Sequence, residues 1–142
     1  MSIPLPDNPA GHVCLTFDFD GPSLWIQRGQ TTPAPISRGE FGAVATPRIL
    51  KLLAKHDIAS TFFVPGHTID TYPDVCRMIV DHGCEVGLHG YTHEYNPRLS
   101  ADEERSIMER TYRQVEVLTG APPKGYRAPS GDITARTFDL LL

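Results

Sequence analysis

Apolar residues along the chain gather into short runs that are separated by longer stretches with helical spacing. The short runs are rich in β-branched and aromatic residues, which is typical of buried strands. The four predicted strands are 12–19, 58–64, 84–88 and 125–128.

Each predicted strand is followed by apolar positions at helical spacing. Pro47 and Pro73 stand where proline is favoured, at the first position of a helix. Ser100 and Glu103 form a capping box that opens a third helix, and 134–142 begins a fourth. The stretch between the first strand and Pro47, 21–45, is rich in Gly, Pro, Thr and Ser. We expect it to be a long functional loop over a site.

The resulting order, βαβαβαβα, predicts an α/β fold with a parallel sheet and right-handed crossovers. A complete (β/α) barrel takes ~250 residues, so 142 residues supply about the first four βα units of one. The chain stops inside an apolar helical run, 138–142, which predicts that the natural protein continues. We therefore expect a lead-in at 1–11 and the N-terminal portion of one domain at 12–142.

Composition narrows the classes of partner. The net charge is −4 and no basic run is present, which disfavours nucleic acid. No apolar run approaches the ~18 residues of a membrane span, and the N-terminus has no secretory pattern, so we expect a cytoplasmic protein without a membrane partner. The three cysteines lack the spacing of a metal knuckle and are expected to be small buried residues.

Polar side chains stand at the end of every predicted strand, where parallel α/β folds build their sites. They are Asp18 and Asp20, His67, His89 and His93, and Arg127. This convergence is the main argument for a site, because chance would not place all of them at strand ends.

His89 and His93 are four residues apart, so on a helical turn both imidazoles could share a metal. With one carboxylate, Asp20, they would make a three-ligand site with an open position for water, typical of catalytic zinc. Cobalt, nickel, manganese or iron would also suit these ligands. The alternative is two unrelated surface histidines, beside a solvated Asp-Gly turn.

The remaining carboxylate, Asp18, is then available as a general base, and Arg127 could hold it ionised. His67 is a candidate third imidazole, although histidines are also common in loops. Trp25, Phe41 and Tyr91 could line a substrate groove or could simply pack the long loop.

Three segments resemble the motifs of the polysaccharide-deacetylase (NodB homology) family. Leu15–Gly21 (LTFDFDG) is similar to its first motif, which implies that Asp18 is the catalytic base and Asp20 a metal ligand. Ser60–Glu94, with STFFVPG and EVGLHGYTHE, resembles the second block, which implies metal binding by its two histidines. Gly125–Pro129 (GYRAP) resembles the third motif, whose Arg contacts the base.

Two positions depart from the usual family pattern. Phe19 separates two aspartates that are normally adjacent, a variant that resembles the family's intracellular branch of peptidoglycan-deacetylase-like and allantoinase-like proteins. Ser130 replaces an aromatic residue that normally follows Pro129. The family's later motifs, which include the acid for the leaving amine, have no counterpart before residue 142 and are expected beyond it.

The sequence therefore predicts a metal-dependent hydrolase of non-peptide amide C–N bonds. The resemblance favours removal of N-acetyl groups from an amino-sugar polymer or oligomer. The alternatives are hydrolysis of a small cyclic amide or ureide, and a catalytically incomplete metal-binding fragment. Expected partners are the carbohydrate or small amide substrate and either a second copy of the chain or the remaining C-terminal part. The expected substrate contacts are Trp25, Phe41, His67, Tyr91 and Pro129.

Overall fold

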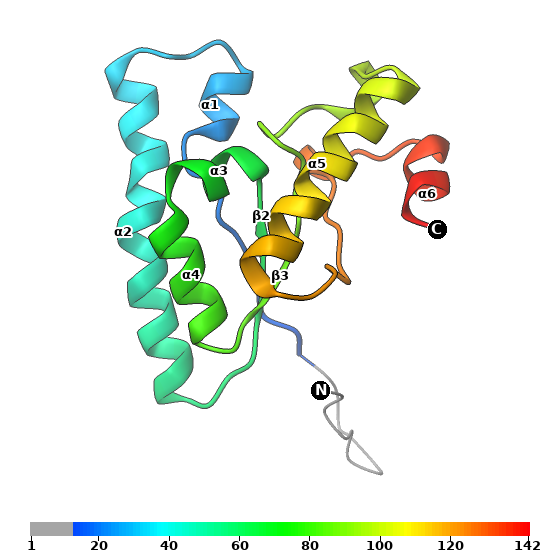
Figure 1. Cartoon of the computed structure of the whole chain (residues 1–142). Coiled ribbons are helices and arrows are strands. Elements are labelled where there is room, and N and C mark those ends of the chain that lie inside the picture. Colours follow the sequence, from blue (N-terminus) through cyan, green and yellow to red (C-terminus); the bar gives the residue numbers. More distant parts are fainter. Residues whose placement is uncertain (1–12) are drawn as a thin grey trace.

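The computed structural model describes residues 13–142 and confirms an α/β fold with parallel strands. Strands β1 (Thr16–Asp18), β2 (Thr61–Val64) and β3 (Glu85–Leu88) pair in the order β1-β2-β3 (Figure 1). The predicted fourth strand is reduced to one parallel bridge between Leu88 and Tyr126. The expected lead-in, 1–11, lies outside the described residues.

Within residues 13–142, six α-helices connect and cover the strands: α1 (Ser23–Gln27), α2 (Pro33–Lys55), α3 (Gly66–Thr71), α4 (Pro73–Asp81), α5 (Ala101–Thr119) and α6 (Ala135–Leu141). Two short 3₁₀ turns, η1 (Asn96–Arg98) and η2 (Pro129–Gly131), follow the third and fourth strand positions. The predicted capping box at the start of α5 is present, because Ser100 and Glu103 bond each other's backbone N–H. Among residues 13–142, no helix is long and apolar enough to cross a bilayer.

The prediction of a long loop at 21–45 is wrong. This segment forms α1 and the first part of α2, so that Pro47 lies inside α2 and does not open it. The physical reason is close packing. A Cβ at Gly39 would clash with the backbone of Gly21, and one at Gly42 would lie 3.1 Å from the Phe19 ring. The two glycines therefore let α2 lie directly against the end of β1.

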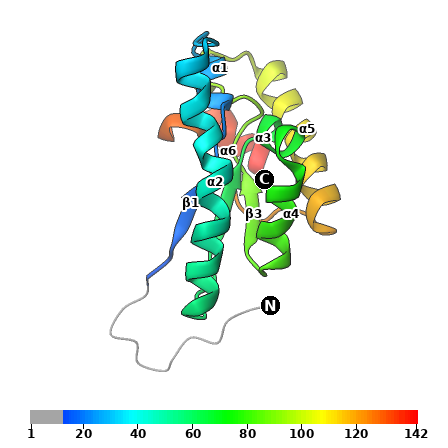
Figure 2. The ribbon, with the colours of Figure 1, turned by 90° about the vertical axis from the view of Figure 1, so that its left-hand side faces the viewer.

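The core lies between the sheet and the helices on one of its faces. Helices α2, α4 and α5 lie side by side along the sheet (Figure 1). Along β2, Phe62 and Val64 are buried against them, whereas Thr61 and Phe63 on the other face are half-exposed. Figure 2 shows β1 at the margin of the sheet, away from α4 and α5.

Two of the three cysteines are buried as predicted. Cys76 is fully buried in the core and Cys84 accepts a hydrogen bond from the Ser60 hydroxyl at 3.4 Å. The prediction for Cys14 is wrong, because this residue is exposed. It precedes β1, which pairs with only one neighbour among the described strands, so no element covers it.

Candidate metal centre

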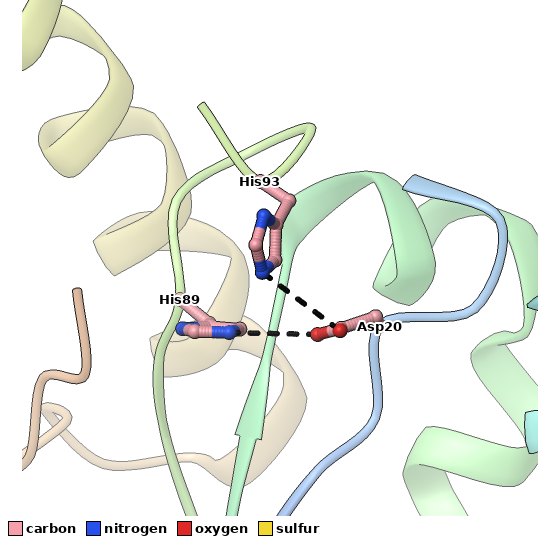
Figure 3. A group of neighbouring side chains, drawn as sticks. All are labelled: Asp20, His89 and His93. Atoms are coloured by element: carbon pink, nitrogen blue, oxygen red, sulfur yellow. Dashed lines mark ion pairs between the residues drawn. The ribbon is translucent and has the colours of Figure 1, made fainter. Parts of the chain in front are cut away.

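Three side chains from the ends of β1 and β3 meet in one place. Asp20 follows β1 by two residues, His89 directly follows β3, and His93 comes from the loop beyond it. One ligand atom from each lies within 4.8 Å of the others (Figure 3). The Nε2 atoms of His89 and His93 lie 3.4 and 3.8 Å from the Asp20 carboxylate oxygens.

The hydrogen bonds of His89 fix which of its nitrogens is free. Nδ1 lies 2.7 Å from the carbonyl oxygen of Arg127. A carbonyl can only accept, so Nδ1 carries the proton and, in the neutral ring, Nε2 presents a lone pair toward Asp20. A lone pair facing a carboxylate is unfavourable unless a cation lies between them. Nε2 of His89 and Oδ1 of Asp20 are both buried and have no hydrogen-bond partner among the described residues.

Burial disfavours the charged forms of both Asp20 and His93. Desolvation raises the pKa of Asp20 above its usual value, against the smaller opposing effect of His89 and His93. Desolvation likewise lowers the pKa of His93, although the Asp20 charge opposes this. Burial therefore disfavours the charges that would be needed for an ion pair without a metal. One carboxylate and two neutral imidazoles are the donor set that zinc and similar divalent metals take, so the residues fit such an ion.

Asp20 is held in place through its main chain. Its carbonyl oxygen accepts hydrogen bonds from the hydroxyls of Ser23, at 2.7 Å, and Thr68, at 2.5 Å. Thr68 belongs to α3, so this contact ties the end of β1 to the helix that follows β2.

The loop that carries His93 is not the helical turn that the i, i+4 spacing predicted. Gly90 and His93 both have positive φ, +67° and +64°, so the chain turns sharply between the two imidazoles. Glu94 holds this turn: its carboxylate accepts hydrogen bonds from the backbone N–H groups of Tyr91 and Thr92, both at 2.8 Å. Positive φ is costly for a residue other than glycine, and such strain is typical of functional positions. The sequence reasoning missed Glu94, although its place directly after His93 was a possible signal.

Beside the three candidate ligands, Arg127 donates a hydrogen bond to Oδ1 of Asp18. It also donates to the Thr16 hydroxyl at 2.6 Å, and its guanidinium carbon lies 4.2 Å from the centre of the Phe63 ring. The other Asp18 oxygen, Oδ2, faces the centre, 3.9 Å from Nε2 of His89. The predicted pairing of Asp18 with Arg127 is thus present, and Thr16 is an additional partner that shares a strand face with Asp18.

The residues expected to contact substrate fall into separate groups. Trp25 and Phe41 line a hollow that also contains Asp18 and Asp20. His67 and Tyr91 instead pack edge to face, with ring centres 6.2 Å apart, and His67 does not join the group of possible ligands. Pro129 is buried.

Tyr91 is engaged with α3 and α5. Its hydroxyl donates to Asp70 at 3.0 Å, and the guanidinium carbon of Arg110 lies 3.4 Å from the ring centre. Gln114 also donates to Asp70, at 2.7 Å. These contacts brace the loop that carries the histidines.

Comparison with known proteins gives the class of the molecule. The profile of the family described as "Polysaccharide deacetylase" matches residues 6–141. The chain therefore belongs to the polysaccharide deacetylase family.

Individual proteins agree with this membership. The chain is 41% identical over 133 residues to a peptidoglycan deacetylase of Helicobacter pylori, covering 92% of this chain and 45% of that protein. Among solved structures, one from Mycobacterium smegmatis whose name assigns it to the polysaccharide deacetylases superposes with a TM-score of 0.90 at 34% identity, covering 98% of this chain and 50% of the other. A pseudoenzyme of family CE4 from Bacillus anthracis superposes with a TM-score of 0.67 at 36% identity, covering 69% of this chain and 35% of the other. The chain thus spans between 35% and 50% of the length of these three proteins.

Proposed function

We propose that this protein removes N-acetyl groups from amino sugars of a glycan of the peptidoglycan type, using one divalent metal, zinc. The observation that carries the proposal is the pair of buried, unpartnered atoms, Nε2 of His89 and Oδ1 of Asp20, that face each other at 3.4 Å. Asp20, His89 and His93 would hold the ion. Membership of the family and the similarity to a peptidoglycan deacetylase support the substrate class.

A metal in this position would polarise the amide carbonyl and lower the pKa of water. Asp18 and Arg127 would carry out the proton transfer that the reaction also needs. Arg127 holds Oδ1 of Asp18, which leaves Oδ2 turned toward the centre to accept a proton from the attacking water. The Arg127 guanidinium fixes the orientation of this carboxylate through the hydrogen bond to Oδ1.

The test combines metal content with turnover in the whole protein. We expect one zinc ion per chain in the parent and in His67→Ala, which removes an imidazole outside the centre, and none in His89→Ala. We expect the zinc form to release acetate from N-acetylglucosamine oligomers or peptidoglycan but not to open a cyclic imide. Asp18→Asn should retain the metal and lose most of the turnover. A parent that binds zinc and releases no acetate from either glycan would refute the proposed reaction.

The cytoplasmic location expected from the sequence, and the packing of the chain against either a second copy or the remaining C-terminal part, are parts of the same proposal. Fractionation of cells that make the whole protein, and light scattering of the purified protein, would test them.

A further inference from the structure

A hollow of about 300 Å³ opens beside Asp18 and Asp20, between the end of β1 and the unit formed by α1 and α2. The wall formed by α1 and α2 carries two aromatic side chains, Trp25 from α1 and Phe41 from α2, and one basic side chain, Arg38 from α2. A space next to the candidate centre that offers both flat apolar rings and a cation is suited to an amphipathic, charged ligand.

The charges on the wall are not balanced in pairs. Asp18 is paired with Arg127, and Asp20 belongs to the candidate metal centre. Arg38 is the only basic residue among the described residues that line the hollow. Its guanidinium carbon lies 5.7 Å from the centre of the Trp25 ring, and no described carboxylate lies within ion-pair distance of it. A guanidinium in that situation has donors to spare for an anionic group.

The position of Arg38 is set by the residue that follows it. Gly39 is buried, and any side chain there would clash with the backbone of Gly21 and Pro22. Helix α2 therefore approaches the turn after Asp20 closely enough to exclude a side chain at Gly39, and it carries Arg38 to the edge of the hollow. The segment that was predicted to be a loop is therefore a helix that places a cation beside the candidate centre.

We propose that Trp25 and Arg38 form a subsite for an acidic amino sugar, a saccharide ring that carries a carboxylate, as N-acetylmuramic acid does. The Trp25 ring would pack against the apolar face of the sugar. The guanidinium of Arg38 would bind the carboxylate through two parallel hydrogen bonds. This inference rests on the proposed function for the general class of substrate and adds the requirement for a negative charge.

The chain offers a direct probe, because Trp25 is its only tryptophan. Its fluorescence can be titrated with N-acetylmuramic acid and with neutral N-acetylglucosamine, in the zinc-loaded protein at low salt. We expect the parent to bind the acidic sugar about tenfold more tightly, the effect of a charge-assisted hydrogen bond of ordinary strength. Arg38→Gln should remove this difference and leave the affinity for the neutral sugar unchanged.

Arg28→Gln is the matched control. The Arg28 guanidinium carbon lies 5.9 Å from the centre of the same ring, but Arg28 does not line the hollow, so its replacement should preserve the preference for the acidic sugar. Both arginines are exposed, and circular dichroism will check that the variants fold.

Equal affinity of the parent for the two sugars, no binding of either, or an unchanged preference in Arg38→Gln would overturn the subsite. The readout is binding and does not need turnover. A protein that shows the Arg38-dependent preference but releases no acetate would therefore refute the proposed reaction and retain the subsite.

Discussion

The main-chain carbonyl of Arg127 accepts the Nδ1 proton of His89 at 2.7 Å, while the side chain of the same arginine binds Asp18. One residue therefore orients a candidate metal ligand through its backbone and a candidate base through its guanidinium. The two roles reside in different parts of the residue, so mutation can separate them. A hydrogen bond from the ring nitrogen that does not bind the metal typically fixes the tautomer and direction of a ligating histidine.

Arg127→Ala should lower kcat for acetate release about 100-fold, the size of an ordinary general-base contribution. Zinc affinity should be unchanged, because alanine keeps the carbonyl that orients His89. Calorimetric zinc titration and steady-state kinetics of the whole protein would measure the two effects. Arg113→Ala, at an exposed position on α5, is the control. A marked loss of zinc affinity in Arg127→Ala would contradict the separation.

Compared with the parent, Asp20→Asn should be more stable without metal and less stable when zinc is added. Burial raises the pKa of Asp20, so the folded chain binds this proton more tightly than the unfolded chain does. Stability contributed by the proton is present at pH values below the ordinary 3.8 and is lost as pH rises through the folded-state pKa. At pH 7 the charge is therefore a cost, which the neutral amide removes.

We expect the Tm of metal-free Asp20→Asn at pH 7 to rise by about 3 °C, the effect of ~1 kcal/mol in a domain of this size. Added zinc should raise the Tm of the parent and have little effect on the variant. Calorimetry in EDTA and in zinc would show both, with the exposed Asp132→Asn as control. A lower Tm for Asp20→Asn in EDTA would show that the ion pairs outweigh the burial of the charge.

Glu94→Gln should weaken zinc binding about 10- to 100-fold, the usual effect of disturbing a partner behind the ligands. Gln has one acceptor oxygen where the carboxylate uses two, so the turn that places His93 loses bonds from Tyr91 or Thr92. Competition with a chromophoric chelator would measure the affinity. Glu109→Gln, on the exposed face of α5, should bind zinc like the parent.

Gly39→Ala should destabilise the chain, although alanine is the better helix former by ~1 kcal/mol at an open position. The added methyl group would clash with the Gly21 backbone, and overpacking of this kind typically costs about 1–3 kcal/mol. Urea unfolding followed by circular dichroism would show whether the substitution lowers or raises the free energy of unfolding. Ser37→Ala, exposed on the same helix, should be neutral or slightly stabilising.

The cysteines should differ sharply in reactivity. Burial raises the pKa of Cys76 to about 12, and Cys84 is also buried, whereas Cys14 is exposed. Since the thiolate is the reactive form, we expect one thiol to react quickly with a disulfide reagent in the native chain and the other two only on unfolding. Cys14→Ser should abolish the fast phase. A fast phase that persists in this variant would show that a buried thiol becomes accessible.

Much of the fold could be predicted because its signals are local. The alternation of strand-type and helix-type runs predicts that the strands are parallel, as β1, β2 and β3 are, and the strand-end rule brings Asp18, Asp20 and His89 to one edge of the sheet. The role of these residues in metal binding and catalysis stays a prediction.

The predictions from the sequence fail where packing or a single side chain decides the local structure. Proline and glycine disfavour helix in isolation, yet the close approach of Gly39 and Gly42 to the end of β1 makes 33–45 helical. In the same way, the i, i+4 spacing of the histidines suggested a helical turn, but the hydrogen bonds that Glu94 accepts impose a different one. Periodicity carries no information on either contact.

The unit formed by α1 and the first part of α2 supplies Trp25, Arg38 and Phe41 to the hollow but none of the three candidate metal ligands. It begins directly after Asp20, and two of its glycines, Gly39 and Gly42, lie against the backbone of Gly21 and the ring of Phe19. For protein engineering, residues 21–45 could thus be replaced as one segment: a graft that keeps both glycines and Ser23 could alter the proposed sugar subsite and leave the three candidate metal ligands in place.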